Sequence, residues 1–599
     1  MLKKEEILKT EHNFANSTTK NKISFFSAML VVVGSCIGSG IFFKAKAVLE
    51  GSQGSIILAM ICWIFVGIAV LAMALALLEI ASARNDNLSL IGWCKTFNNR
   101  FIYKMSKNFM FFIYTPVKGF FLPLYLIWSF QDAVASIYIQ NGMPYHGFGT
   151  NVDWLIIMFL TIAVSSYFII VCGLSAKAGN IQNWIITSLK FFPLILAGVI
   201  GFVIFGMNGG HVVGNYNATF VPSTSPVDAY TFKFISPGFG FFIASTGILY
   251  AYDGFYSSAS IKTEMKDPKK SPLAILVGLI VTTAIYLLIA ISMSLGSQHG
   301  DPQGLVSFFA KHNILPLFAV FEMLIAVGIM GVINGYSLFA TRFMVDLARD
   351  NELPFSKKAA TYIAKKNRFV GVIYDLSITI PTIILLTIIG IFYSNDHSSV
   401  LFISDVNQLP NVDLITSNPN FKDFLGEVQT QQGTITSLSY NYGVRVGELY
   451  TFCDLVSNWG ALFVFMFVAL SIYGGIKNRK NEFVKVQKFK FFIPFAYLSI
   501  IFISLPLFMS IFEPFANLFL LFRIPTSTLD YEANILVPRI MATVMLFIYI
   551  GFTVLPTIIS DRLDIKKYGS IANAEKQKLA EINVILGEPL KADSNSDMI

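Results

Sequence analysis

Two glycines and a serine interrupt the first apolar segment of the chain, residues 25–43. Glycine in a helix interior costs about 1 kcal/mol relative to alanine, so Gly38, Ser39 and Gly40 predict a break in a membrane-spanning helix. An outer half-helix that starts near Gly40 would offer free amides to a carboxylate. An inner half that ends near Ile37 would offer free carbonyls to an ammonium. The break therefore predicts a site for a small charged solute, such as an amino acid zwitterion.

A second interruption lies in the middle of the apolar segment 237–261. It contains an aspartate followed by a glycine, and an aspartate at membrane depth costs about 2.5–3.5 kcal/mol on insertion scales. Paired interruptions in corresponding spans are typical of transporter sites near the bilayer midplane. The residues expected to form this half of the site are Tyr250, Ala251, Tyr252, Asp253 and Gly254.

These features also have structural interpretations. Gly34 and Gly38 match the small-residue spacing of packed transmembrane helices. Asp253 suits a cap on an inner half-helix as well as a contact to a cationic substrate side chain. Tyr250 fits an aromatic lid over the site and a core aromatic equally well. The residues alone leave these alternatives open.

The elements that must position these residues are membrane-spanning helices. Of the 599 residues, 54% are hydrophobic and 13% are charged, against about 25% charged in soluble domains. A span needs about 20 apolar residues. We therefore predict an all-α polytopic membrane protein with twelve spans, at 25–43, 55–82, 109–137, 153–174, 182–206, 237–261, 273–296, 314–340, 370–393, 450–475, 490–512 and 535–560.

The basic residues predict the orientation of these spans. With the N-terminal tail 1–24 in the cytoplasm, most of the 44 Lys and Arg residues fall on the cytoplasmic side, as the positive-inside rule requires. Both termini are then cytoplasmic. The predicted parts are a ten-helix core at 25–475 with two inverted repeats (about 25–206 and 237–475), an outer loop at 394–449 that is either a small cap or disordered, two peripheral spans within 490–560, and a tail at 561–599.

Two further helices are expected outside the spans. The amphipathic loop 83–108 predicts a helix at the membrane interface. The tail predicts a short helix near 572–586.

The sequence favours neither an enzyme nor a channel. The five cysteines show no disulfide or metal-ligand spacing, and all six histidines lie in loops or tails. No catalytic group, metal site or cofactor is therefore expected. The net charge of +8 is explained by topology rather than by nucleic-acid binding. A small solute and the lipid bilayer are the expected partners.

Five segments resemble the amino acid–polyamine–organocation superfamily, whose members adopt the leucine-transporter fold. They are GSGIF at 38–42, ALALLEIAS at 74–82, KFFPL at 190–194, AYDGF at 251–255 with EMKDPKKSP at 264–272, and the end of span eight from Arg342 to ARDNELP at 348–354. Beyond residue 355 only the hydropathy pattern agrees. The resemblance implies a leucine-transporter-like fold in which spans one and six are discontinuous, and transport of amino acids by alternating access.

The resemblance also implies a coupling residue. Lys190 matches a lysine that takes the place of a sodium ion bound by sodium-coupled relatives. Transport is then expected to be independent of sodium. Lys190 either exchanges a proton during the cycle or stays charged and bridges spans one, five and eight.

Several residues are candidates for gates. Tyr250 is one, and Glu79, Glu264 and Arg342 lie near the cytoplasmic ends of their spans. Structural or solvated charges are the simpler interpretation for these three. Lys118 in span three faces either the substrate path or a headgroup region.

One branch of the superfamily binds a single-pass partner through a cysteine in the loop after span three. Residues 138–152 contain no cysteine. No disulfide-linked ancillary subunit is therefore expected, and the sequence leaves the oligomeric state open.

Taken together, these features predict a secondary active amino acid permease of the cell membrane, driven by proton coupling or exchange. Its substrate is either neutral or cationic. A polyamine or organic amine transporter of the same fold is the alternative.

Overall fold

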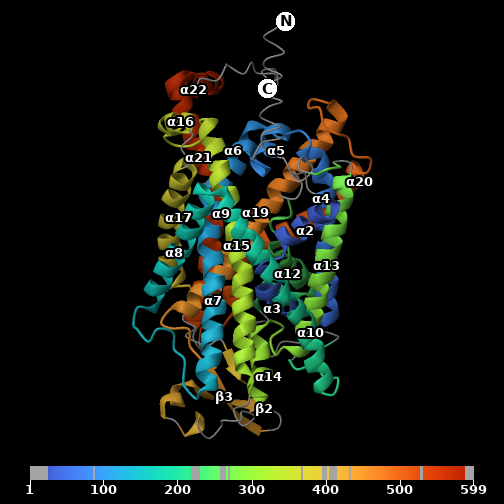
Figure 1. Cartoon of the computed structure of the whole chain (residues 1–599), viewed down its shortest axis with the longest axis vertical. Helices are drawn as coiled ribbons and strands as arrows, with labels where there is room; N and C mark the ends of the chain where they lie inside the picture. Colours follow the sequence, from blue (N-terminus) through green and yellow to red (C-terminus); the bar gives the residue numbers. More distant parts are fainter. Residues whose placement is uncertain are drawn as a thin grey trace.

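The computed structural model describes residues 24–84, 88–214, 216–217, 230–256, 265–267, 270–365, 369–393, 401–403, 415–417, 419–430, 433–526 and 531–586. Within these residues, ten helical stretches are long and apolar enough to cross a membrane. They run along the long axis of the molecule (Figure 1). They are 56–81 (α4), 100–140 (α6, η1 and α7), 153–174 (α8), 181–207 (α9 and α10), 271–296 (α13), 315–349 (α15), 369–390 (α17), 446–481 (α19), 492–523 (α20 and η8) and 537–568 (α21).

The remaining two predicted spans are the discontinuous ones. Span one is divided into α2 (Phe25–Cys36) and α3 (Gly40–Gly51), and span six ends early as α12 (Pro237–Ala251). Residues 257–264, where the inner half of span six was expected, lie outside the described residues. The helical membrane fold and the interruption of both spans are confirmed.

Local sequence explains where several helices begin. The Ser55 side chain accepts a hydrogen bond from the Leu58 amide and so starts α4 (Ile56–Ala81). Ser175 does the same for α9 (Ala176–Leu189), through the Ala178 amide. Such N-caps satisfy amides that a helix start leaves free. Proline in the first turn, where its missing N–H costs nothing, starts α12, α13 (Ser271–Gly296) and α15 (Leu315–Arg349).

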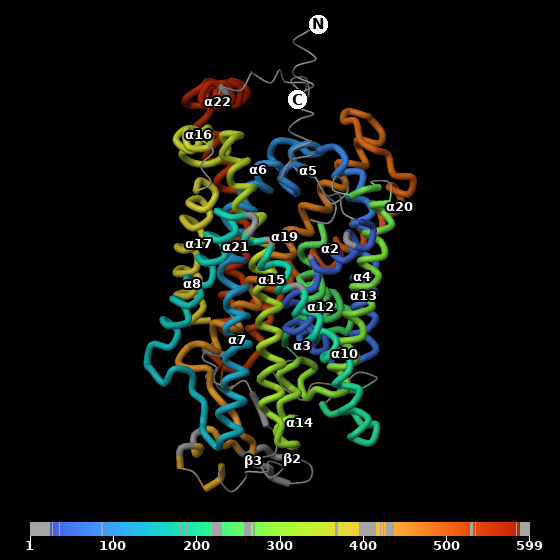
Figure 2. Tube along the Cα trace, in the orientation of Figure 1, coloured from blue at the N-terminus to red at the C-terminus, as the bar shows by residue number. Residues whose placement is uncertain are grey.

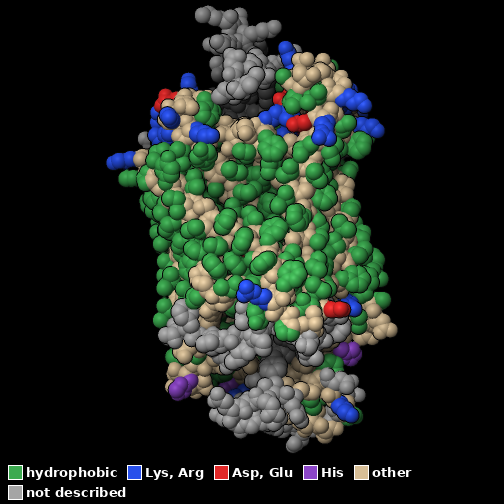
Figure 3. All heavy atoms as spheres, turned by 180° about the vertical axis from the view of Figure 1, so that it is seen from behind, with side chains coloured by type: hydrophobic (Ala, Val, Ile, Leu, Met, Phe, Trp, Pro, Cys, Tyr) green, Lys and Arg blue, Asp and Glu red, His purple; other side chains and the backbone are tan. Residues whose placement is uncertain are grey.

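The surface divides into a wide apolar belt and a basic end. Hydrophobic side chains cover the middle of the molecule, and Lys and Arg gather at one end of it (Figure 3). The short helices α5 (Leu90–Phe97), α16 (Ser356–Ala364) and α22 (Ile571–Leu586) lie at that end (Figure 2). The helices expected in the loop 83–108 and near 572–586 are thus present as α5 with α6 (Arg100–Asn108), and as α22.

The opposite end carries a small antiparallel sheet with strand order β1-β3-β2, which the sequence did not predict. Its strands are β1 (Leu401–Ile403), β2 (Leu425–Thr430) and β3 (Gly433–Tyr440). Tyr440 and Tyr442 donate hydrogen bonds to Asp132 of α7 (Thr115–Gln140). The Gln303 amide donates to the same carboxylate over 2.6 Å. The described part of the loop 394–449 is therefore a cap anchored to the helix bundle.

A π-helical segment, η1 (Phe109–Tyr114), joins α6 to α7. Toward the basic end of the molecule, Lys104 and Lys107 both form ion pairs with Glu352, at 2.6 and 2.8 Å. Burial alone would raise the pKa of Glu352, and the two ammonium groups bring that pKa below its usual value. The start of this long span is thereby fixed. Short π-helical segments are frequent at functional sites.

Close backbone contact fixes α10 (Phe191–Met207) against α13. A Cβ on Gly201 would overlap the carbonyl of Ser292. The Gly201 amide also donates a hydrogen bond to the Ser292 hydroxyl over 3.0 Å. That hydroxyl in turn donates to the Ala197 carbonyl over 2.6 Å. The two helices therefore approach closely here, with the small Ser292 side chain bridging their backbones.

This contact gives a matched pair of variants. Gly201→Ala should lower the midpoint of thermal unfolding of the detergent-purified protein, because overpacking typically costs about 1–3 kcal/mol. Gly206→Ala, on the same helix with no atom within 4 Å of the new Cβ, should leave it unchanged or raise it, since alanine is the better helix former. Equal midpoints for the two variants would contradict the contact.

Candidate functional site

The two interrupted spans meet at their breaks. A Cβ on Gly40 would lie 2.8 Å from the Cβ of Ala251 and would overlap its Cα. A Cβ on Gly38 would lie 2.6 Å from a methyl group of Val332 on α15. Both glycines are therefore required by close approach, and the start of α3 lies against the end of α12. The structure thus brings together the two groups of residues that the sequence predicted as one site.

The carbonyls at the end of α2 accept hydrogen bonds from a side chain of the protein itself. The Lys190 ammonium donates to the carbonyl of Gly34 over 2.7 Å and to that of Ile37 over 3.4 Å. Lys190 lies between α9 and α10 and is buried. On its other side, a Cβ on Gly328 of α15 would lie 3.6 Å from the Lys190 Cβ. The lysine therefore joins the predicted spans one, five and eight.

The end of α12 is satisfied in a similar way. The Tyr286 hydroxyl lies 2.7 Å from the carbonyl of Ala251 and 2.9 Å from that of Cys36, so one proton serves two helix ends. In the turn that follows, the backbone amides of Tyr252 and Asp253 donate hydrogen bonds to the preceding carbonyls of α12. Gly254 in this turn has φ of 108°, a conformation that favours glycine.

The start of α3 is different. Its N-cap residue, Ser39, makes no side-chain cap, and its carbonyl accepts from the amides of Phe42 and Phe43. Among the described residues, the amides of Gly40 and Ile41 have no acceptor. They lie at the positive end of the helix dipole. The break therefore presents an open site for an anion rather than for a cation.

Tyr250 covers this break. Its hydroxyl forms a hydrogen bond of 2.8 Å with the Ser39 hydroxyl. Its ring packs edge-on against Phe121 of α7. Above the ring, the Lys44 ammonium lies 4.9 Å from the centroid. Tyr250 is buried, and its position agrees with an aromatic lid that forms part of a packed core.

An ion pair lies on the side of the breaks that faces the basic end of the molecule. The Lys118 ammonium is 2.7 Å from Asp253 Oδ2, and the Asp253 side chain is only 5% exposed. The Tyr114 hydroxyl is 2.9 Å from both carboxylate oxygens. The Lys118 ammonium also lies 4.3 Å from the centroid of the Tyr114 ring. Lys118 thus lies beside the interrupted span six and forms an ion pair with Asp253.

A second ion pair lies on the side of the breaks that faces the end with the β-sheet. Lys44 of α3 is fully buried, and its ammonium lies 2.8 Å from Asp454 Oδ1 on α19 (Val446–Asn481). It also donates to the Ser457 hydroxyl over 3.0 Å. The Tyr125 hydroxyl donates to the same carboxylate oxygen. This cluster joins the outer half of span one to span ten.

The other predicted gate residues are not brought together. Glu79 of α4 forms a bidentate pair with Arg479 of α19, with both contacts at 2.6 Å. It also accepts from the Phe489 amide over 2.7 Å, so it holds together the end of α4, the end of α19 and the segment before α20. Arg342 is exposed on α15 and has no ion pair within the described ranges. Glu264 lies outside the described residues.

Comparison with known proteins decides the family. A model of the amino acid permease family matches residues 23–547. The chain belongs to the amino acid permease family. This membership carries the leucine-transporter fold, agrees with the predicted resemblance, and makes the protein a transporter rather than an enzyme.

Relatives of this permease differ in how much is known of them. An uncharacterized protein of Mycoplasma pneumoniae is 36% identical over 93% of this chain and 97% of its own. The serine/threonine exchanger SteT of Bacillus subtilis is 26% identical over 57% of this chain and 70% of its own. The b(0,+)-type amino acid transporter 1 of Mus musculus is 22% identical over 68% and 76%. The crystal structure of MhsT with L-phenylalanine covers 89% of this chain at 14% identity, with a TM-score of 0.43.

Sequence reasoning missed both ion pairs of this permease. It treated Lys44 as part of an external segment and did not consider Asp454, although a carboxylate within the predicted span 450–475 is a functional signal by itself. It recognised Lys118 as unusual and Asp253 as costly. Their partnership was not visible, because spans three and six are far apart in the sequence.

The Lys118–Asp253 pair gives a double-mutant test. Lys118→Met or Asp253→Asn alone should destabilise the permease by about 3–5 kcal/mol, because each leaves one buried charge without its partner. The double variant should recover most of that loss. Thermal unfolding in detergent measures the effect.

The exposed pair Lys488–Glu482 is the control. Removing either of its members should change stability by less than about 1 kcal/mol. Strictly additive losses for Lys118 and Asp253 would show that the two charges do not interact.

Proposed function

We propose that this permease moves neutral amino acids across the cell membrane by alternating access, without sodium, and with its basic end and both termini in the cytoplasm. The single observation that carries the proposal is the meeting of the two breaks. There the carbonyl ends are satisfied by Lys190 and Tyr286, and the amides of Gly40 and Ile41 are open.

The open amides suit a carboxylate. Hydrogen bonds to a charged group contribute about 1.5–3 kcal/mol each, more than neutral ones. The Ser39 hydroxyl lies beside them and adds a third donor. Carbonyl oxygens have a second lone pair, so that of Ala251 still suits the substrate ammonium. A polyamine has no carboxylate for these amides, which disfavours that alternative.

The state of Asp253 bears on which charge the substrate side chain can carry. Its carboxylate is paired with Lys118 at 2.7 Å, so it offers no free negative charge to a cationic side chain. We therefore favour neutral amino acids over the arginine or lysine that a free Asp253 would bind. A relative whose name describes a serine/threonine exchanger agrees with this and favours exchange over proton coupling.

Lys190 supports transport without sodium. Its ammonium occupies the space between the end of α2 and α15, where it donates to two carbonyls of span one. A sodium ion there would need the same carbonyl oxygens as ligands. The fixed positive charge thus replaces the ion.

The two ion pairs fit the roles of gates. Lys44–Asp454 closes the outer side of the breaks, and Lys118–Asp253 closes the inner side. Alternating access requires that each opens in turn. The basic surface at the end with α5, α16 and α22 (Figure 3) supports the cytoplasmic assignment of that end.

Uptake by reconstituted protein tests the site. Gly40→Val should abolish uptake of radiolabelled serine into proteoliposomes, because the new side chain would separate α3 from α12 at Ala251. Gly206→Ala on α10 is the control, since its Cβ would have no atom within 4 Å. Both variants should insert into membranes.

The same assay measures selectivity by competition with the twenty amino acids, putrescine and spermidine. Neutral amino acids should compete and the polyamines should not. Uptake by Gly40→Val at the level of the control, or competition by polyamines alone, would refute the proposed function.

Replacement of external sodium by choline tests the coupling. Uptake by the wild-type permease should stay unchanged. Lys190→Met should lose uptake in both media, because the carbonyls of Gly34 and Ile37 lose their donor. Uptake that rises severalfold with sodium in the absence of a proton gradient would overturn sodium independence.

A further inference from the structure

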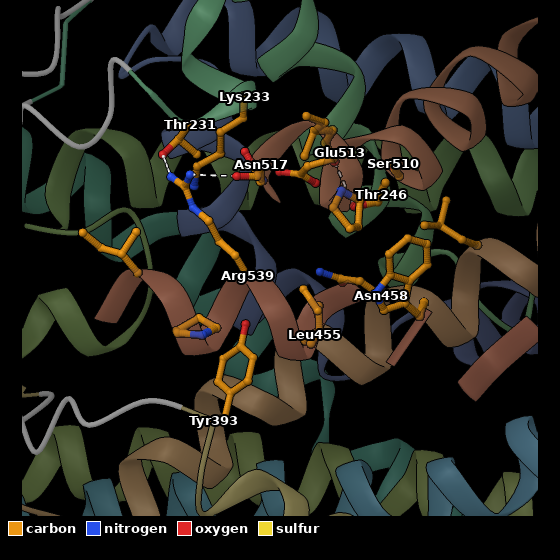
Figure 4. Close-up of a pocket in the computed structure, with 17 residues that line it drawn as sticks. Thr231, Lys233, Thr246, Tyr393, Leu455, Asn458, Ser510, Glu513, Asn517 and Arg539 are labelled. Atoms are coloured by element: carbon orange, nitrogen blue, oxygen red, sulfur yellow. Dashed lines mark hydrogen bonds between the residues drawn. The ribbon is translucent and has the colours of Figure 1, made fainter. Parts of the chain in front are cut away.

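A second polar cavity lies away from the breaks. It has a volume of about 420 Å³, within the range of about 300–1,000 Å³ typical of small-molecule sites. Helices α12 and α19 of the core form one wall, and α20 (Phe492–Leu520) and α21 (Val537–Tyr568) form the other. Figure 4 shows side chains from these helices around one space.

This cavity holds two opposite charges that do not pair with each other. The Arg539 guanidinium of α21 donates to the carbonyl of Asn517 over 3.0 Å and to the Thr231 hydroxyl over 2.9 Å. Within the described part of the chain it has no carboxylate partner, and Glu513 of α20 has no ammonium or guanidinium partner within 4.0 Å. The remaining lining cation, Lys233, is directed to Glu50 at 3.9 Å. Glu513 hydrogen-bonds the Asn517 side chain and feels the charge of Lys233 from a distance. Among the described residues, neither Arg539 nor Glu513 has an ion-pair partner, so each can still take an opposite charge from a ligand.

Further polar atoms around the cavity also lack partners. The Trp459 indole N–H and the Ser510 hydroxyl are buried and make no hydrogen bond to any described residue, and neither does the side-chain oxygen of Asn458. All three residues line the cavity. Buried polar groups without partners are rare and costly. Their convergence with Arg539 and Glu513 indicates a ligand that satisfies them.

We propose that this cavity binds a zwitterion, with its anionic group at Arg539 and its ammonium at Glu513. Two sources share this chemistry. One is the headgroup of a zwitterionic phospholipid, which would enter between the peripheral helices from the bilayer. The other is a free amino acid. Either ligand would pair both charges at once, whereas a ligand with a single charge would leave one of them buried and unpaired.

The cavity shares two helices with the central site. On α12, Thr246 lines the cavity, and a Cβ on Gly247 would touch Lys44 at 3.4 Å. On α19, Ser457 contacts Lys44, and Asn458 lines the cavity. Neighbouring residues therefore face two different sites.

Native mass spectrometry of the full-length, delipidated protein tests the lipid source. Phosphatidylethanolamine should be retained in preference to phosphatidylglycerol with the same acyl chains. Arg539→Gln and Glu513→Gln should each reduce this retention about tenfold, since each removes one charge-assisted contact. Arg523→Gln and Glu532→Gln are matched controls, because both residues are exposed, lie in the neighbouring segments and do not line the cavity.

Calorimetric titration with serine tests the amino acid source. A second binding step should be seen in the wild-type protein, should be lost in Arg539→Gln and Glu513→Gln, and should persist in both controls. Thermal unfolding without ligand verifies that each variant is folded. The titration is repeated in the Gly40→Val background, in which the central site is expected not to function. A binding step that remains there is assigned to the cavity.

The proposal is supported if either zwitterion binds in this way. It is overturned if phosphatidylglycerol is retained as well as phosphatidylethanolamine and serine shows no second step. It is also overturned if the two cavity variants behave as their controls do. Transport does not enter these measurements, so their failure and a failure of the proposed function are distinguishable.

Discussion

The structure depends on one constraint: a helix that breaks inside a membrane must find a partner for every backbone group that it frees. At the ends of α2 and α12 the donors come from Lys190 and Tyr286, which lie on other spans. The start of α3 receives no such partner. The polarity of the site follows from this difference, because the protein satisfies the electronegative ends and leaves the electropositive one open.

The buried charges follow the same logic. Three of them lie in pairs that join two spans: Lys44 of α3 with the partly exposed Asp454 of α19, and Lys118 of α7 with Asp253 after α12. Burial of such pairs adds little net stability, since desolvation offsets the attraction, but removal of one member is costly. Water that enters from one side can replace such a contact at a modest cost in free energy. Ion pairs therefore suit spans that must both close and separate.

Sequence reasoning was most successful where the signal is local. Glycine at positions 38 and 40, and the aspartate in span six, reveal the breaks because each is unfavourable in its own helix. Partners could not be predicted in the same way. Tyr286 looks like any apolar-span tyrosine until α13 places it between two helix ends. The π-helical η1 and the sheet that follows span nine depend likewise on packing, which leaves no periodic trace in the sequence.

Helices α12 and α19 connect the parts of the molecule because each has two polar faces. One face of α19 presents Asp454 and Ser457 to Lys44, and the other presents Asn458 and Trp459 to the cavity of Arg539 and Glu513. These polar contacts add to the apolar packing of α19, most of whose buried residues belong to the hydrophobic core. Opening of the outer ion pair and occupancy of the second cavity therefore act on the same helix, and the peripheral spans α20 and α21 are thereby linked to the transport core.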